Sequence, residues 1–257
     1  MNKAILSLYR TGTVKEIGKS NLKSLIQRGL IDDDGKLTKS GKVYALSKMS
    51  LVKQCEFMEL KLKTIKLEYY ERPEFAMLSY FKSLGYIGVS CEGGGLLTIL
   101  KALMLDKLSK YNPFNNREDA CSRYLEAQFV SLKDQLKEII SEINIVPKER
   151  FIKNFQEIIS TPYITSTYPE LSTDFASSMF DAIDKKTFTR VANKFAEDPY
   201  KFRNGWPDIT LIKNGVVEFI EVKTSDKLHE NQLMTIPVMR KILPFDFYVF
   251  KLIKIND

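Results

Sequence analysis

The sequence of 257 residues is poor in the side chains that most often bind transition metals, with one histidine and three cysteines. A single imidazole, on His229, argues against hydrolases that need two or more histidines for acid–base catalysis or metal binding. Cys55, Cys91 and Cys121 are an odd number at wide spacing with no CxxC pair, so we expect reduced, structural thiols and no zinc site. Chemistry based on carboxylates and lysine remains.

Long apolar runs are also absent, although 44% of the residues are hydrophobic, which is enough for a substantial core. The run from Leu96 to Leu105 contains a lysine and falls short of the roughly 18 residues of a membrane span. The apolar stretch at the N-terminus is too short, and too soon followed by charge, for a secretory signal. We therefore expect a cytoplasmic protein without a transmembrane helix, associated with the nucleoid if its source is bacterial.

Positive charge is unevenly distributed along the chain. The formal net charge is +7, and residues 1–70 hold 14 lysines and arginines against 7 aspartates and glutamates, a difference that accounts for all of it. A basic module suits a surface that follows phosphates, because each neutralised phosphate releases a counterion. A lysine-rich solvated face is the alternative interpretation.

The N-terminal residues predict a small helical module. Residues 3–11 and 20–30 have the spacing of amphipathic helices, and a tight turn at 32–35 precedes a strand-and-turn pattern at 36–43 and a further helix. This succession resembles a winged helix over about residues 1–50, and apolar spacing at 51–70 predicts a basic connecting helix. Such modules contact DNA or dock proteins, and both remain open. If DNA is bound, the candidate contacts are Lys23, Lys36 and Lys39.

The middle of the chain is predicted to be helical. A helix is expected at 74–84, where Pro73 marks its start. Residues 90–95 include three consecutive glycines and interrupt regular structure before an apolar helix at 96–108. Residues 115–197 keep helical spacing with interruptions at prolines and show no strand pattern. This segment is therefore predicted as a helical insertion.

The C-terminal part changes from helical to strand periodicity. Two β-rich runs, 208–213 and 216–223, are joined by Asn214-Gly215, which is typical of a two-residue hairpin. A helix at 230–242 and a last strand at 247–253 follow. These elements predict an α/β core.

The residues that carry chemistry lie on this hairpin. Glu221 and Lys223 are two positions apart, so in a strand they project to one face, and Asp208 at the start of the partner strand can meet them. Two converging carboxylates suit Mg²⁺ or Mn²⁺, and the Val222 carbonyl can add a third oxygen. Lys223 would lie near a metal-bound water, where burial and the metal charge can lower its pKa so that it orients or deprotonates the nucleophile.

The segment RNGWPDITLIKNGVVEFIEVKTSDKLHENQ resembles the VRR-NUC branch of the PD-(D/E)xK nuclease superfamily. The matching positions are Arg203, Gly205, Pro207, Asp208, Glu221, Val222, Lys223, Asp226, Leu228 and Gln232. The departure is Thr224-Ser225, where a Gly-Pro pair is frequent in that branch, which affects the shape of the loop more than its chemistry. The resemblance implies a restriction-endonuclease-like core and a metal-dependent phosphodiester hydrolase.

Within this branch, the Fanconi-associated nuclease type is the most similar. It has a further catalytic glutamate in a glycine-containing loop before an apolar helix, a pattern that residues 90–108 match and that assigns this role to Glu92. Glycines also let a phosphate approach the backbone closely, whereas a simple acid near a helix start is the alternative for Glu92. A helical insertion before the Pro-Asp motif is a further shared feature. The resemblance covers about residues 70–257, so we predict a nuclease domain at 71–257 after the basic module.

Other candidates lie around this motif. Gln232 and His229 are expected at the start of a helix facing phosphate, or else in solvent. Arg203 and Lys227 are candidates for contacts with the DNA backbone, which position a nucleic acid without reading its sequence. Trp206 is expected either beside the site or in the core.

Together these features predict a Mg²⁺- or Mn²⁺-dependent DNA nuclease with Glu92, Asp208, Glu221 and the Val222 carbonyl as metal ligands. Lys223 and Gln232 complete the predicted catalytic set. The resemblance implies branched or flapped DNA and a role in repair or recombination, and we favour a monomer. Three alternatives remain open, namely a toxin or defence nuclease that cuts duplex DNA, a non-catalytic DNA-binding module, and a nuclease that acts on RNA.

Overall fold

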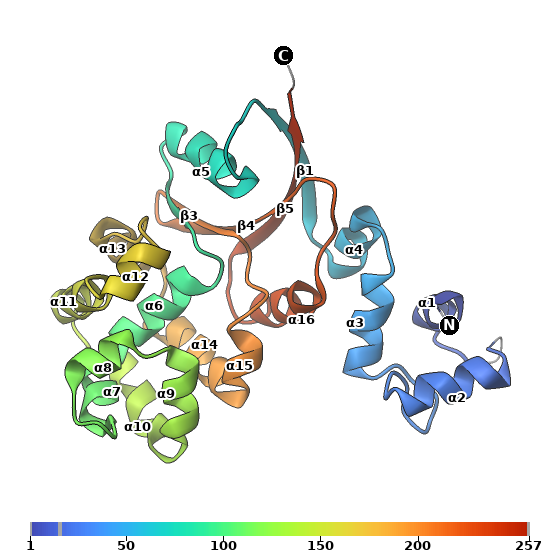
Figure 1. Ribbon diagram of the computed structural model, residues 1–257, viewed down its shortest axis with the longest axis horizontal. Coiled ribbons are helices and arrows are strands. Elements are labelled where there is room, and N and C mark those ends of the chain that lie inside the picture. The colour runs from blue at the N-terminus through green and yellow to red at the C-terminus, as the bar shows by residue number, and fades with distance from the viewer. Residues whose placement is uncertain (1, 15–16, 256–257) are drawn as a thin grey trace.

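The computed structural model describes residues 2–14 and 17–255. A five-stranded mixed sheet separates a small N-terminal group of helices from a large helical region, as Figure 1 shows. None of the helices in these ranges is long and apolar enough to cross a membrane. The strands are β1 (Lys61–Leu67), β2 (Ile87–Ser90), β3 (Ile209–Lys213), β4 (Val216–Lys223) and β5 (Asp246–Lys254).

The sheet has the order β1-β5-β4-β3-β2. β5 pairs in parallel with both β1 and β4, whereas β3 is antiparallel to β4 and to β2. The predicted hairpin is confirmed, because Asn214 and Gly215 both adopt positive φ between β3 and β4, as a two-residue turn of the favoured kind requires. The α/β core predicted for the C-terminal part is therefore present.

Helices cover the two faces of the sheet. α5 (Pro73–Ser83) packs Met77, Leu78 and Phe81 against one face, where it meets Ile220 and Val222 of β4. The opposite face, with Phe219, joins the main hydrophobic core together with α16 (Glu230–Met239) and the large helical region. Successive residues of β4 thus point to opposite faces, so Glu221 and Lys223 share the side of Phe219.

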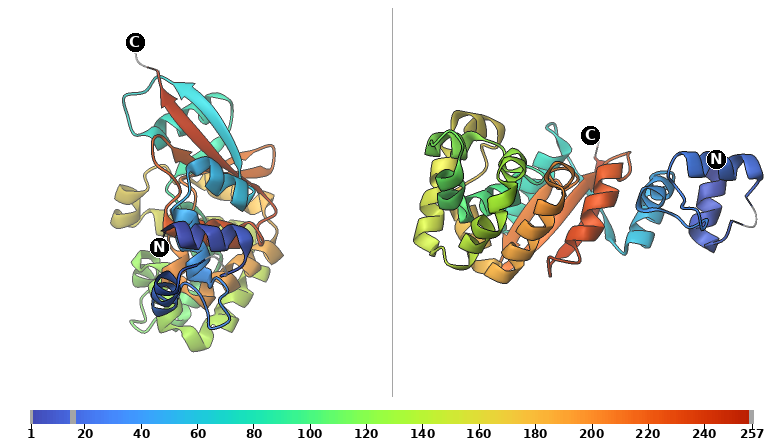
Figure 2. Two further views of the ribbon diagram at one scale, coloured as in Figure 1. Left: turned by 90° about the vertical axis from the view of Figure 1, so that its right-hand side faces the viewer. Right: turned by 90° about the horizontal axis from the view of Figure 1, so that it is seen from below.

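The N-terminal group has a hydrophobic core of its own, built around Ile5, Leu25 and Ala45. An antiparallel bridge between Ile31 and Leu37 encloses the predicted turn. The right-hand view of Figure 2 shows this group beyond α16, on the opposite side from the large helical region. Its helices are α1 (Asn2–Thr11), α2 (Lys19–Gln27), α3 (Lys39–Ser47) and α4 (Leu51–Met58).

The connecting helix predicted over 51–70 is wrong beyond Met58. Glu59 takes a left-handed conformation with φ of 54° and ends α4, and residues 61–67 then form β1 at the edge of the sheet. Apolar residues at 60, 62, 65 and 67 fit a strand as well as a helix, which explains the error. The alternating lysines of β1 suit an exposed edge, because charge there discourages pairing with other chains.

The large helical region lies between β2 and β3. Residues 94–202 form helices and two short 3₁₀ turns, Lys133–Gln135 and Glu142–Asn144, in agreement with the helical pattern of the sequence. The helices are α6 (Gly94–Leu103), α7 (Leu105–Tyr111), α8 (Arg117–Ser122), α9 (Leu125–Ser131), α10 (Leu136–Ser141), α11 (Lys148–Ile159), α12 (Pro162–Thr167), α13 (Thr173–Ala182), α14 (Lys185–Glu197) and α15 (Pro199–Phe202).

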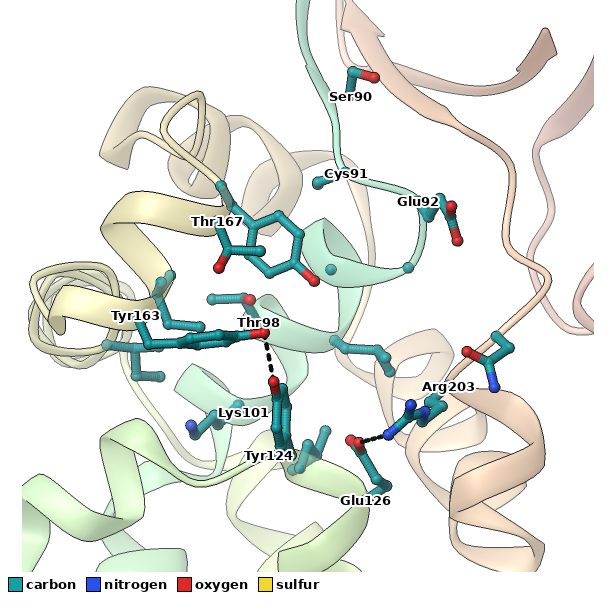
Figure 3. A pocket seen from close by; sticks show the side chains of 18 of the residues that line it. Ser90, Cys91, Glu92, Thr98, Lys101, Tyr124, Glu126, Tyr163, Thr167 and Arg203 are labelled. Carbon is teal, nitrogen blue, oxygen red and sulfur yellow. Dashed lines mark hydrogen bonds and ion pairs between the residues drawn. The ribbon is translucent and has the colours of Figure 1, made fainter. Parts of the chain in front are cut away.

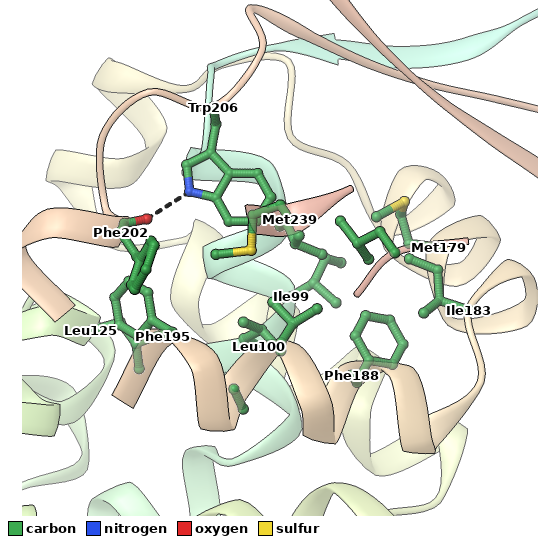
Figure 4. Close-up of a cluster of buried hydrophobic side chains, with 14 of the residues drawn as sticks. Ile99, Leu100, Leu125, Met179, Ile183, Phe188, Phe195, Phe202, Trp206 and Met239 are labelled. Carbon is green, nitrogen blue, oxygen red and sulfur yellow. Dashed lines mark hydrogen bonds between the residues drawn. The ribbon is translucent and has the colours of Figure 1, made fainter. Parts of the chain in front are cut away.

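Trp206 anchors the loop between α15 and β3 in the main core. Its indole N–H donates to the carbonyl of Phe202 at 2.7 Å, and Figure 4 shows the ring beside Met239. The side chain is fully buried, so of the two sequence interpretations the core position is the one observed. This anchor fixes the chain two residues before Asp208.

Candidate active site

Asp208, Glu221 and Lys223 come together at the end of the β3–β4 ladder. Beyond the last paired residues, Asp208 Oδ2 accepts a hydrogen bond from the amide of Val222 at 2.7 Å. Lys223 Nζ lies 2.8 Å from Glu221 Oε1. The Glu221 side chain is fully buried and Lys223 is 5% exposed. The structure thus brings two carboxylates and an ammonium group together, with Glu221 and Lys223 buried and Asp208 half-buried, as the spacing on the strand predicts.

Burial and neighbouring acidic groups disfavour the charged form of both carboxyl groups. Burial raises the pKa of Asp208 to about 6. Burial, and next the neighbouring charge of Asp208, raise the pKa of Glu221 well above its usual value. Glu221 Oε2 is buried and has no hydrogen-bond partner. A buried carboxylate oxygen with neither donor nor cation is costly, so this corner favours binding of a positive charge.

Lys223 remains an ammonium group in this environment. Burial lowers its pKa, but attraction to Glu221 and Asp226 outweighs that effect, so the pKa is raised. The Asp226 carboxylate lies 3.2 Å from Nζ. In the metal-free protein the carboxylates thus stabilise the charged form of Lys223 by more than burial disfavours it. This geometry suits a lysine that donates hydrogen bonds rather than one that accepts a proton.

Gln232 holds Glu221 from the first turn of α16. Its amide nitrogen donates to Glu221 Oε1 at 2.6 Å, and its Oε1 accepts from the backbone amide of His229 at 3.0 Å. Gln232 is therefore oriented by the helix start and fixes one oxygen of the buried acid. The His229 side chain is mostly exposed and lies 3.4 Å from Asp226. The structure thus brings Gln232 to the predicted site, while the His229 imidazole stays at its rim.

Gly205 lets the loop that carries Asp208 approach the start of α16. Its φ is +78°, and a Cβ there would lie 2.2 Å from the backbone oxygen of Asn231. Gly215 has a similar φ of +75° but open space around it, so an alanine at Gly215 would cost only the strain of the backbone conformation. We expect Gly205→Ala to reduce the free energy of unfolding by about 1–3 kcal/mol more than Gly215→Ala, because only the first also forces a backbone clash. Chemical denaturation of both variants measures the difference, and equal losses would contradict it.

Glu92 lies on the loop between β2 and α6. Its φ of 47° is unusual for a residue other than glycine, and its amide donates to the carbonyl of Asp208 at 3.2 Å. The carboxylate is exposed, lines the same pocket as Asp208, and contributes to the raised pKa of Asp208. The loop between β2 and α6 thus places Glu92 beside the site.

The glycines after Glu92 are required by packing. A Cβ on Gly93 would lie 2.4 Å from the indole of Trp206, and one on Gly94 would lie 2.9 Å from the ring of Tyr168. Their sequence pattern suggests close approach of a phosphate. In the structure, aromatic rings occupy the space beside Gly93 and Gly94.

Glu74 is a carboxylate of this site that the sequence analysis missed. It lies in the first turn of α5, lines the pocket with Asp208 and Glu92, and contributes to the raised pKa of Asp208. Its Oε2 is buried without a hydrogen bond and lies 3.6 Å from Arg72 Nε. Only its position after Pro73 stands out in the sequence, and an acid there is also explained by the helix dipole.

The donor set fits a divalent cation bound mostly by water and substrate. Among the described residues, no three histidine, cysteine or acidic side chains are close enough to form a ready metal cluster. Asp208 and Glu221 nevertheless carry hard carboxylate oxygens of the kind that Mg²⁺ prefers, and Oε2 of Glu221 has no donor bonded to it in this structure. Mg²⁺ is commonly held by only one or two carboxylates while keeping several waters.

The predicted nucleic-acid contacts fall into two groups. Arg203 lines the pocket but is ion-paired with the buried Glu126 at 2.8 Å, and Lys227 donates to the carbonyl of Ser47 in the N-terminal group. Both therefore have structural partners. The other three, on the N-terminal group, are exposed to solvent, namely Lys23, Lys36 and Lys39.

Comparison with known proteins shows a likeness in fold. No family model matches the sequence, and no curated protein matches it. The crystal structure of paFAN1, a nuclease of Pseudomonas, bound to 1-nucleotide 5′-flap DNA with a gap has a TM-score of 0.60 and 14% identity, and the match covers 99% of this chain. The structure of paFAN1 bound to 2-nucleotide 5′-flap DNA with a gap has a TM-score of 0.57 and 16% identity, and that match covers all of this chain.

Each match covers 49% of the paFAN1 chain, so this protein spans about half the length of the structures that it resembles. At these identities the likeness shows a shared mixed α/β fold. It supports the predicted resemblance at the level of architecture.

Proposed function

We propose that this protein is a divalent-metal-dependent nuclease that hydrolyses phosphodiester bonds in branched or flapped DNA. The observation that carries the proposal is the buried cluster of Asp208, Glu221 and Lys223, in which Glu221 Oε2 has no partner. The likeness in fold to a nuclease bound to 5′-flap DNA supports it and suggests the class of substrate.

Asp208, Glu221, Glu92 and the Val222 carbonyl are the proposed ligands of Mg²⁺ or Mn²⁺. When bound, the ion would supply Lewis acidity and neutralise charge on the phosphate. Gln232 holds Glu221 in place through one oxygen and leaves the other free for the ion. Glu74 adds negative charge at the pocket side of the cluster.

The Lys223 ammonium would orient the attacking water and stabilise the charge that develops on phosphate oxygens. In the reaction, the water oxygen forms a bond to phosphorus as the bond from phosphorus to the leaving sugar oxygen breaks. A proton of the water passes to solvent, and the leaving sugar oxygen takes up a proton from solvent. The raised pKa of Lys223 supports a role as a hydrogen-bond donor.

The exposed lysines of the N-terminal group are proposed to contact the DNA backbone away from the cut. Lys23, Lys36 and Lys39 lie on the basic part of the chain, and their contacts would position the duplex without reading its sequence. Docking of a protein by the same surface is the alternative.

The test is cleavage of labelled 5′-flap, 3′-flap, four-way-junction and plain duplex DNA in Mg²⁺, Mn²⁺ or EDTA. We expect the wild type to cut branched DNA only with a metal ion, and Asp208→Ala to lose this activity. Indiscriminate duplex cutting would point instead to a toxin or defence nuclease, and equal cutting of matched RNA branches would widen the substrate to RNA. Binding without cutting in every metal would overturn the assignment.

A further inference from the structure

The interface between the N-terminal group and the α/β core contains a buried glutamine. Gln54 lies on α4 and is fully shielded from solvent. Its amide nitrogen donates to the carbonyls of Leu46 and Leu228 at 3.1 and 3.2 Å, and its oxygen accepts from the amide of Leu228 at 2.9 Å. One side chain thus pairs with both backbone polar groups of Leu228, as a neighbouring strand would, and uses both of its N–H donors.

The segment that Gln54 holds connects the catalytic strand to the following helix. Residues 224–229 lie between β4 and α16. In the part of the chain that the structure describes, none of residues 225–228 takes part in a backbone–backbone hydrogen bond. The side chain of Lys227 reaches the carbonyl of Ser47, also in the N-terminal group. Side chains and carbonyls of the N-terminal group therefore fix this segment in place of a strand or a helix.

The same segment makes two contacts with the proposed active site. Asp226 lies 3.2 Å from Lys223 Nζ. The backbone amide of His229 donates to Gln232 Oε1, and the amide nitrogen of Gln232 in turn donates to Glu221 Oε1 at 2.6 Å. A displacement of the segment would therefore disturb the partners of both the buried acid and the ammonium group.

Gln54 can influence the reaction only through this segment. Figure 3 shows the pocket that Asp208 lines, with Glu92 and Arg203 on its wall. Among the described residues, neither Gln54 nor any of 224–229 lines that pocket. A fully buried amide outside the pocket cannot touch a substrate, so its effect must pass through the backbone that it binds.

We propose that Gln54 is a positioning residue of the active site, supplied by the N-terminal group. By holding the backbone of Leu228, it keeps Asp226 beside Lys223 and keeps Gln232 oriented toward Glu221. The proposal rests on the proposed nuclease function and makes the N-terminal group a part of the catalytic unit. Residues that orient a metal ligand from behind typically change metal affinity or activity about 10- to 100-fold when they are replaced.

The first test compares two variants of the full chain at saturating Mg²⁺ on labelled 5′-flap DNA. Gln54→Met keeps the length of the side chain and removes its three hydrogen bonds. We expect its kcat to fall about 10- to 100-fold while KM stays the same, because the geometry of the acid changes and the DNA-facing surface does not.

Arg240→Met is the matched control. Arg240 donates to the carbonyl of Met58, the last residue of α4, so this variant breaks a contact of the same interface without touching 224–229. It should keep both kcat and KM. An equal fall of kcat in the two variants would overturn the proposal, because the loss would then come from loosening the interface as a whole.

The second test does not depend on cleavage. Amide hydrogen exchange in EDTA should show Leu228 and His229 protected like the strand β5 in the wild type, and in Gln54→Met both should lose protection relative to β5. Fast exchange at Leu228 in the wild type would overturn the proposal even if no variant folds. So would unchanged protection of His229 in Gln54→Met. A wild type that cuts nothing in Mg²⁺ or Mn²⁺, combined with the expected loss of protection, would keep the role of Gln54 in holding the segment and refute the nuclease.

Discussion

Replacing Glu221 with glutamine is expected to abolish cleavage and at the same time to stabilise the metal-free protein. Glutamine can keep the geometry, because its carbonyl oxygen can accept the hydrogen bonds that Glu221 Oε1 receives from Gln232 and Lys223. Its amide nitrogen then replaces the unpartnered Oε2 and can donate to the carboxylate of Asp208, which lies close enough to disfavour the charge of Glu221. The variant therefore removes a buried charge without creating a cavity.

The gain in stability should grow with pH. A carboxyl group whose pKa is raised in the folded state holds a proton at pH values where the unfolded chain has released it. Its contribution to the free energy of unfolding is therefore fully present below the pKa of the unfolded state and is lost as the pH rises through the pKa of the folded state. For Asp208 that window runs from 3.8 to about 6. Glu221 is shifted in the same direction. As the pH rises, the folded wild type must carry more of the charge of both carboxyl groups, whereas Glu221→Gln carries only that of Asp208.

The measurement is thermal unfolding in EDTA at pH 5 and pH 8, combined with cleavage in Mg²⁺. We expect the free energy of unfolding of Glu221→Gln to exceed that of the wild type by about 1–3 kcal/mol at pH 8 and by less at pH 5. Its cleavage rate should fall on the order of 10³-fold or more. Adding Mg²⁺ should stabilise the wild type more than the variant. A destabilised variant at pH 8 would show that the buried charge is satisfied in a way that this structure does not contain.

The hairpin that carries this site is predictable because its signals are local. Asn214-Gly215 fixes the turn, and the two-residue spacing places Glu221 and Lys223 on one face whatever the rest of the chain does. The position of Asp208 follows from the same register. Strand identity is harder to predict where the apolar spacing fits both a helix and a strand, and for that reason the sequence predicts a helix where the structure has β1.

The parts of the site that sequence reasoning did not place come from distant elements. Glu74 reaches the pocket from α5 and Gln54 reaches Leu228 from α4, and neither lies in a pattern that distinguishes it from an ordinary helix residue. Gln54 looks like a solvated residue of an amphipathic helix, although the fold buries it against the backbone of Leu228. Such residues become visible only when the packing of the helices is known.

Replacing Lys223 with methionine should have the opposite effect on stability and the same effect on activity. Methionine fills a similar volume but removes the ammonium group that lies 2.8 Å from Glu221, so the metal-free protein should lose about 3–5 kcal/mol at pH 8, as when one member of a buried ion pair is removed. The loss should shrink as the pH falls, because the fold favours the protonated form of Glu221, which does not need an ammonium partner. The cleavage rate should fall on the order of 10³-fold, because the donor that faces the developing phosphate charge is gone.

The double variant Glu221→Gln with Lys223→Met separates this account from general damage. If the lysine acts on stability mainly through the charge of Glu221, then Lys223→Met should cost much less in the Glu221→Gln background than in the wild type, with a coupling free energy of about 1–3 kcal/mol. Urea denaturation of the wild type, the two single variants and the double variant at pH 8 in EDTA measures this coupling free energy. Additive losses would mean that Lys223 stabilises the fold through packing of its carbon chain or through Asp226, and not through Glu221.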